Sequence, residues 1–209
     1  MRKRMILSLV MATTVLCCLH GITVKAYLGV LYWYSDRNEV AMWLHSPTYS
    51  LTMLNGDAGF NYYFTESAEY AKNQWQPVTT SIIKTYASSS ANIPCYGGTK
   101  TELTNATGST VEEGMLGVVF GGQDPFTYIS YNGTTKGLMT QRSPQKLCIV
   151  KFTGLSHGLC RRVFMHELGH AMGWLGHASG VNDIMGLGAN GQLSNADKLQ
   201  LSQVYSFWN

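Results

Sequence analysis

The chain has 209 residues, of which 45% are hydrophobic and 13% charged, and its formal net charge is +3. Four of the 15 basic residues lie within the first 26 positions, which contain no acid. From position 27 onward, 11 basic residues therefore face 12 acidic ones, for a net charge of −1. This balance gives no support to a nucleic-acid partner or to lasting attachment to an anionic membrane.

The first 26 residues have the pattern of a secretory signal peptide. Three basic residues at positions 2–4 precede an uncharged stretch over residues 5–19, and Val24-Lys25-Ala26 offers small residues to a signal peptidase. The uncharged stretch is shorter than the roughly 20 residues that span a bilayer, which disfavours an uncleaved anchor. We therefore expect a secreted, extracellular protein whose mature part, residues 27–209, is a single domain.

The predicted elements begin with strands over residues 28–34 and 60–64. Thr65 is then expected to cap a helix that runs to about Trp75, where Pro77 stops it. Further strands are expected over residues 80–86, 91–96, 115–120 and 147–152, the second of them cut short by Pro94 and Gly97-Gly98.

Two helices complete the pattern. One spans residues 159–173, and Ser194 caps the other, with Asp197 three residues on. The apolar positions of this last helix are Leu199, Leu201, Val204, Tyr205 and Trp208. Strands interleaved with helices predict a mixed α+β fold.

Three cysteines follow the signal: Cys95, Cys148 and Cys160. An oxidising compartment permits a disulfide between Cys148 and Cys160, which leaves Cys95 free; three buried thiols is the alternative. The sequence does not decide between the two arrangements.

The most informative string, HELGHAMGWLGH, runs from His166 to His177. On a helix, His166 and His170 lie one turn apart on one face, where two imidazoles can hold one Zn²⁺. Glu167, next to the first ligand, can reach a water on that metal and act as a general base. The string therefore predicts a zinc-dependent hydrolase.

A continuous helix cannot bring His177 to the same metal. Eleven residues would carry it roughly 16 Å beyond His166. The chain must therefore break and fold back, and Gly173 can adopt the left-handed turn that this requires. Three imidazoles and one water would then complete a tetrahedral site.

The motif from His166 through Gly173 to a further histidine resembles that of the metzincin metallopeptidases, and of their matrixin branch in particular. Met185, eight residues after His177, matches the methionine turn beneath the zinc. The segment LGVVFGG, which begins at Leu116 and Gly117, is similar to the edge strand that binds substrate, and QLSNAD from position 192 is similar to the start of the last helix. The resemblance covers about residues 60–209 and implies a twisted, mostly parallel sheet with an active-site helix and a C-terminal helix.

One departure leaves the third ligand open. The family has two residues between the glycine and the third histidine, whereas this chain has three. Either the turn bulges by one residue and His177 is the ligand, or Asp183, the nearest downstream acid, replaces it. A glutamate ligand further along is excluded, because no glutamate follows Glu167.

The resemblance implies a secreted zinc endopeptidase that acts on a protein or peptide substrate, with one catalytic zinc and a monomeric chain. Structural calcium is not predicted. Two alternatives stay open: a zinc hydrolase of cell-wall or other small peptides, and a non-catalytic binding module that retains a zinc site. Substrate preference and the means of restraining activity are not evident from the sequence.

Overall fold

The computed structural model describes residues 32–34, 47–78, 82–86, 90–121, 127–131, 134–140, 144–174, 177, 183–186 and 192–206. The expected signal peptide and the domain boundary at residue 27 lie outside these ranges. None of the described helices is long and apolar enough to cross a bilayer.

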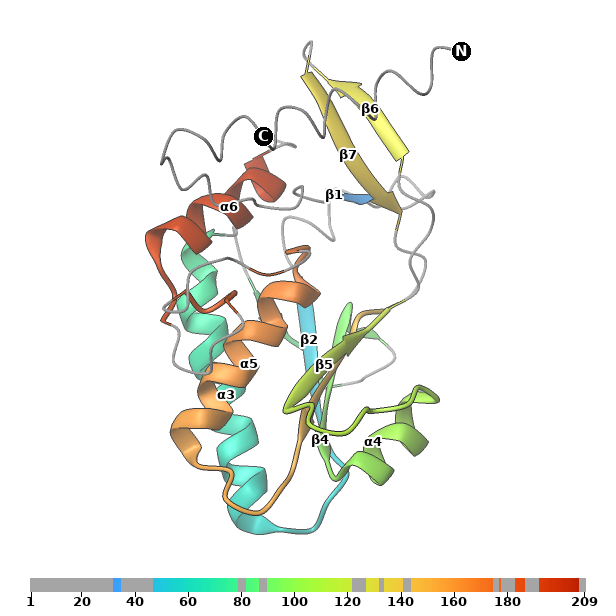
Figure 1. Cartoon of the computed structure of the whole chain (residues 1–209), viewed down its shortest axis with the longest axis vertical. Coiled ribbons are helices and arrows are strands. Elements are labelled where there is room, and N and C mark those ends of the chain that lie inside the picture. The colour runs from blue at the N-terminus through green and yellow to red at the C-terminus, as the bar shows by residue number, and fades with distance from the viewer. Residues whose placement is uncertain are drawn as a thin grey trace, which may run out of the picture.

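A five-stranded, mostly parallel sheet forms the centre of the described structure (Figure 1). Its strands are β2 (Thr48–Met53), β3 (Ile83–Lys84), β4 (Ile93–Gly98), β5 (Gly117–Phe120) and β8 (Lys146–Val150). They are arranged in the order β3-β2-β4-β8-β5, and only β5 runs antiparallel to its neighbour. The predicted mixed α+β class with a mostly parallel sheet is confirmed, and so is a strand at the sheet edge that follows Leu116.

A smaller, three-stranded sheet lies apart from the first in Figure 1. It consists of β1 (Tyr32–Tyr34), β6 (Thr127–Tyr131) and β7 (Thr134–Thr140), in the order β1-β7-β6. The described part of the predicted first strand is β1. The hairpin of β6 and β7 was not predicted.

Helices cover both faces of the larger sheet. The helices α3 (Ala58–Trp75) and α5 (His157–Ala171) lie side by side on one face, and the short α4 (Lys100–Thr107) lies on the other (Figure 1). A 3-10 turn, η1 (Gln76–Val78), follows α3, and α6 (Asn195–Ser206) is the last described helix. The helix α5 also packs against β8 and β5, which brings it beside the sheet edge.

The strand β8, which lies between β4 and β5, is buried on both faces, because its side chains alternate between two cores. Leu147 and Ile149 belong to the core under α3 and α5, and Cys148 and Val150 to the core under α4. Cys160 lies in the first core, so the sheet separates it from Cys148. Of the two arrangements that the sequence left open, the disulfide between them is therefore excluded, and three buried thiols are found.

The strand predicted over residues 60–64 is wrong, because these residues lie inside α3. Asp57 begins this helix, and its carboxylate accepts a hydrogen bond from the backbone N–H of Phe60 at 2.9 Å. Phe60 and Phe64 then form one buried stripe with Trp75, where the helix ends as expected. Burial at helical spacing thus overrides the strand preference of the aromatic residues, and Thr65 is not a cap.

The strand β4 continues through both of its glycines, contrary to the prediction. A Cβ atom on Gly97 would lie 2.9 Å from the ring of Phe64, so glycine at this position lets α3 approach the sheet. Directly after β4, α4 begins with a capping box in which Thr99 and Glu102 bond each other's backbone N–H groups. This helix was missed, although its Thr-x-x-Glu pattern is visible in the sequence.

The predicted cap of the last helix is confirmed. The hydroxyl of Ser194 accepts from the backbone N–H of Asp197 at 3.1 Å, and the carboxylate of Asp197 accepts from the backbone N–H of Ser194 at 2.9 Å. Leu201 is buried as expected, whereas Leu199 is 64% exposed and does not contribute to the core. The side chains of Val204 and Tyr205, and all of Trp208, lie outside the described part.

Candidate metal centre

The helix α5 carries His166, Glu167 and His170 as the sequence predicts. It begins at His157, where the hydroxyl of Ser156 accepts from the backbone N–H of Leu159 at 3.2 Å. One face of the helix is packed into the core through Cys160, Phe164 and Leu168 among others. The histidines lie one turn apart and are only partly buried, so their imidazoles face out of the core.

After α5 the chain turns sharply and brings a third histidine to the first two. Gly173 has a φ of 111°, the positive value expected of glycine at this turn. The ring centroid of His177 lies 5.1 Å from those of both His166 and His170. The three imidazoles offer nitrogen atoms within 4.8 Å of one another, a group that could hold a metal ion. Among the described residues, Asp183 is not part of this group.

Backbone carbonyl groups fix the orientation of two of the imidazoles. Nδ1 of His166 donates to the carbonyl oxygen of Ile184 at 2.7 Å, and Nδ1 of His170 donates to that of Trp174 at 2.8 Å. Because a carbonyl can only accept, both rings carry their proton on Nδ1 and leave Nε2 as a bare lone pair. This arrangement is typical of histidines that bind metals.

The two bare nitrogen atoms point at each other. Nε2 of His166 and Nε2 of His170 lie 3.0 Å apart. Burial lowers the pKa of both rings, that of His170 to about 4, so neither is protonated at neutral pH and no hydrogen bond can join the two lone pairs. Two nitrogen ligands of a tetrahedral Zn²⁺ lie about 3.3 Å apart. The donor set therefore fits a cation of this size held between the rings.

Glu167 is the buried carboxyl group of the site. Its side chain is 7% exposed, and burial raises its pKa to about 8. Within the described chain its carboxylate has no hydrogen-bond or ion-pair partner. A nearby cation would lower this pKa, because opposite charge favours the ionised form. Glu167 is thus a base whose ionisation depends on a positive charge beside it.

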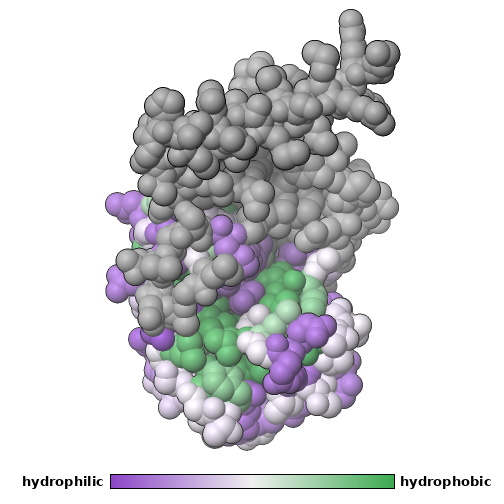
Figure 2. Space-filling view, viewed as in Figure 1, coloured by the Kyte–Doolittle hydropathy of each residue, from purple (hydrophilic) through white to green (hydrophobic). Residues whose placement is uncertain are grey.

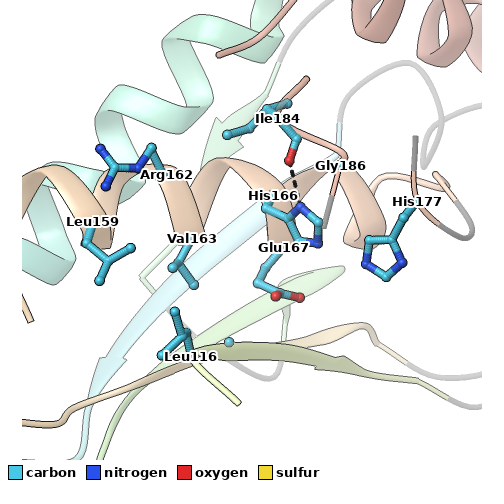
Figure 3. A pocket seen from close by; sticks show the side chains of 10 residues that line it. Leu116, Leu159, Arg162, Val163, His166, Glu167, His177, Ile184 and Gly186 are labelled. Carbon is cyan, nitrogen blue, oxygen red and sulfur yellow. Dashed lines mark hydrogen bonds between the residues drawn. The ribbon is translucent and has the colours of Figure 1, made fainter. Parts of the chain in front are cut away.

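A pocket opens along α5 from the histidines (Figure 3). Leu116 and Gly117, the residues expected to bind substrate, line it together with His166, Glu167 and His177. The other lining residues are Leu159, Arg162, Val163, Ile184 and Gly186. Hydrophobic surface gathers on this face of the molecule, over β5 and α5 (Figure 2).

Sequence reasoning missed the lining residues that come from α5, although a signal for them existed. Leu159, Arg162 and Val163 precede His166 by seven, four and three residues, which are the spacings of one helical face. Ile184 and Gly186, which also line the pocket, flank Met185 in the sequence.

Met185 lies beneath the histidines rather than among them. It is fully buried in the core, and a Cβ atom on Gly169, between the two helical histidines, would lie 2.5 Å from its sulfur. The next residue back, Ile184, donates its backbone N–H to the buried carboxylate of Asp197 at 3.2 Å. Its carbonyl oxygen is the partner of His166, so α6 steadies the turn that orients this imidazole.

No known protein-family model matches this chain, and no curated protein is significantly similar to it in sequence.

Proposed function

We propose that the protein is a secreted zinc-dependent endopeptidase of the metzincin type, similar to the matrixins. One observation carries the proposal: three imidazoles converge beside a buried carboxyl group that has no partner in the described part of the chain, at the end of a pocket that lies along a sheet edge. This combination supplies a metal site, a base and room for a substrate in one place.

His166, His170 and His177 would hold the metal, the first two through Nε2. When bound, Zn²⁺ supplies Lewis-acid chemistry, in that it lowers the pKa of a coordinated water and polarises a carbonyl oxygen. The carbonyl groups of Ile184 and Trp174 keep the first two imidazoles in the tautomer that leaves Nε2 free.

Glu167 would act as the general base and then as the general acid. Its carboxylate takes a proton from the attacking water and passes that proton to the leaving amine of the cleaved peptide bond. Burial raises the pKa of Glu167 and a cation beside it lowers that pKa, and these opposed effects suit a group that must both accept and release a proton. A zinc site with a purely structural role has no use for this carboxylate.

The edge strand β5 would hold the substrate. Among the described strands it pairs only with β8, so its other side is open to an extended peptide. Gly117 begins this strand directly opposite Glu167, since a Cβ atom there would lie 2.7 Å from Cγ of Glu167. A peptide alongside β5 would therefore lie next to the base.

The arrangement of the elements supports the metzincin hypothesis. The sheet has an antiparallel strand at the edge nearest the site, the histidines lie on one helix, Met185 packs beneath them and α6 follows. The extra residue before His177 is accommodated, because this imidazole still reaches the other two. We favour His177 over Asp183 as the third ligand for this reason.

The test is the variant Glu167→Gln, which keeps the shape of the side chain but removes the base. The wild-type protein should cleave unstructured casein when zinc is present, and the variant should lose at least 100-fold in rate while binding zinc equally well by elemental analysis. Glu112→Gln, which changes an exposed carboxylate, is the matched control. Activity of Glu167→Gln close to wild type would refute the assignment.

The same purified protein also distinguishes the endopeptidase proposal from the two other hypotheses. Cleavage of cell-wall peptides but not of casein or gelatin would favour a zinc hydrolase of small peptides. Zinc binding without cleavage of any of these substrates would favour a non-catalytic module.

A further inference from the structure

Arg162, on α5, is one of the residues that line the pocket. It precedes His166 by one helical turn and, in Figure 3, lies beside Leu159 at the end of the pocket far from His177. Its Nε–H group is buried and finds no hydrogen-bond acceptor among the described residues. No carboxylate in the described part of the chain forms an ion pair with it.

The neighbouring Arg161, in contrast to Arg162, has a carboxylate partner. It donates to the carboxylate of Glu66 from Nη2 at 2.5 Å and from Nε at 3.2 Å, and it lies 4.8 Å above the ring of Tyr70. The guanidinium of Arg161 is therefore paired with residues of α3. Arg162, one residue on, faces the pocket instead.

The surroundings of Arg162 define the ligand that would complement it. A guanidinium stays charged at all physiological pH values, and a buried N–H donor without an acceptor is unfavourable. A carboxylate would satisfy it, and bidentate pairing with arginine is the strongest form of that contact. Leu159 beside it, and Val163 and Leu116 further along the pocket, are apolar and suit a methylene stem. A glutamate side chain combines the two features.

Building on the proposed peptidase function, we propose that Arg162 is a specificity-determining residue that selects peptides with an acidic side chain, glutamate above all, next to the cleaved bond. The apolar part of the pocket receives the stem of that side chain, and Arg162 binds its carboxylate. The residue takes no part in the chemical step.

The test compares peptides that differ only in having glutamate, glutamine or leucine at one of the two positions that flank the cleaved bond. For the wild type, kcat/KM for the glutamate peptide should exceed that for the glutamine peptide at least tenfold at one of these positions. In Arg162→Met the ratio should fall to about one, and the leucine peptide should still be cleaved. The matched control, Arg161→Gln, removes the same charge outside the pocket and should keep the preference.

Equal cleavage of the glutamate and glutamine peptides by the wild type would overturn the inference, and so would a preference that survives in Arg162→Met. Binding provides a second readout that does not need turnover. Fluorescence anisotropy of the same labelled peptides on Glu167→Gln should show tighter binding of the glutamate peptide, and Arg162→Met in that background should abolish the difference. If no peptide is cleaved by zinc-loaded protein, the peptidase proposal fails, and the anisotropy still decides the role of Arg162.

Discussion

Gly169 and Met185 fit together because the glycine has no side chain. A Cβ atom at position 169 would lie 2.5 Å from the sulfur of Met185 and 3.0 Å from the ring of Trp75. All three residues are buried, so none of them can move aside into solvent. This close contact determines how near α5 lies to Met185. It thereby influences the position of the imidazoles of His166 and His170, which lie on the same helix.

The variant Gly169→Ala should therefore destabilise the protein. Forcing an extra methyl group into a packed core costs about 1–3 kcal/mol, which outweighs the gain of up to about 1 kcal/mol from better helix propensity. The free energy of unfolding in urea measures the difference. Gly158→Ala is the matched control in the same helix, because its Cβ atom would meet only the end of Arg162 at 3.8 Å. Equal stability of the two variants would contradict the packing described here.

The variant Gly117→Ala should impair catalysis more than folding. Its Cβ atom would lie 2.7 Å from Cγ of Glu167 and 2.7 Å from Cγ1 of Val163, so the base must shift. A misplacement of about 1 Å can lower a rate about 100-fold. We expect a loss of that order in kcat, with zinc affinity unchanged.

The control for this variant is Gly56→Ala, whose Cβ atom would have no neighbour within 4 Å. It should leave kcat unchanged. A Gly117→Ala protein with wild-type kcat would show that Glu167 is not held against β5.

The convergence of the three histidines was predictable because its signals are local. The spacing of His166 and His170 and the break at Gly173 follow from the geometry of one helix and its end. The cap between Ser194 and Asp197 is equally local. Each of these predictions needs only residues a few positions apart in the chain.

The elements that were missed depend on distant partners. Phe60 and Phe64 become helical because α3 packs on β4 at Gly97 and on α5 at Phe164, contacts that no local pattern reveals. In the hairpin of β6 and β7, apolar and polar residues do not alternate strictly, so the sequence pattern did not indicate these two strands. Arg162 was overlooked for a different reason: an arginine on a helix is ordinarily a solvated residue, and only the pocket shows otherwise.

The identity of the third ligand can be tested by metal affinity. In His177→Ala, zinc should bind more than 100-fold more weakly than in the wild type, since loss of a ligand exceeds the 10–100-fold effect of losing an outer-shell partner. In Asp183→Asn, affinity should change by less than tenfold, because Asp183 is not among the three converging groups. Competition with a chromogenic chelator measures both constants. A larger loss in Asp183→Asn than in His177→Ala would reverse the assignment.

The metal-free protein should lose stability as pH rises, and Glu167 should be the cause. Burial raises the pKa of Glu167 from 4.5 to about 8, so the folded state holds a proton that the unfolded state releases. This contribution is fully present below pH 4.5 and is lost as pH rises toward 8. The lowered pKa values of His166, His170 and His177 act in the opposite direction, mainly below their unfolded value of 6.5.

The window from pH 6.5 to 8 therefore isolates the carboxyl group. With a chelator present, the unfolding free energy of the wild type should fall by at most about 1.4 kcal/mol per pH unit relative to that of Glu167→Gln, which cannot ionise. Zinc should cancel this difference, because a cation beside Glu167 stabilises its ionised form. Parallel pH profiles for the two metal-free proteins would mean that Glu167 is already ionised in the folded state without a metal, and that its burial does not hold the proton.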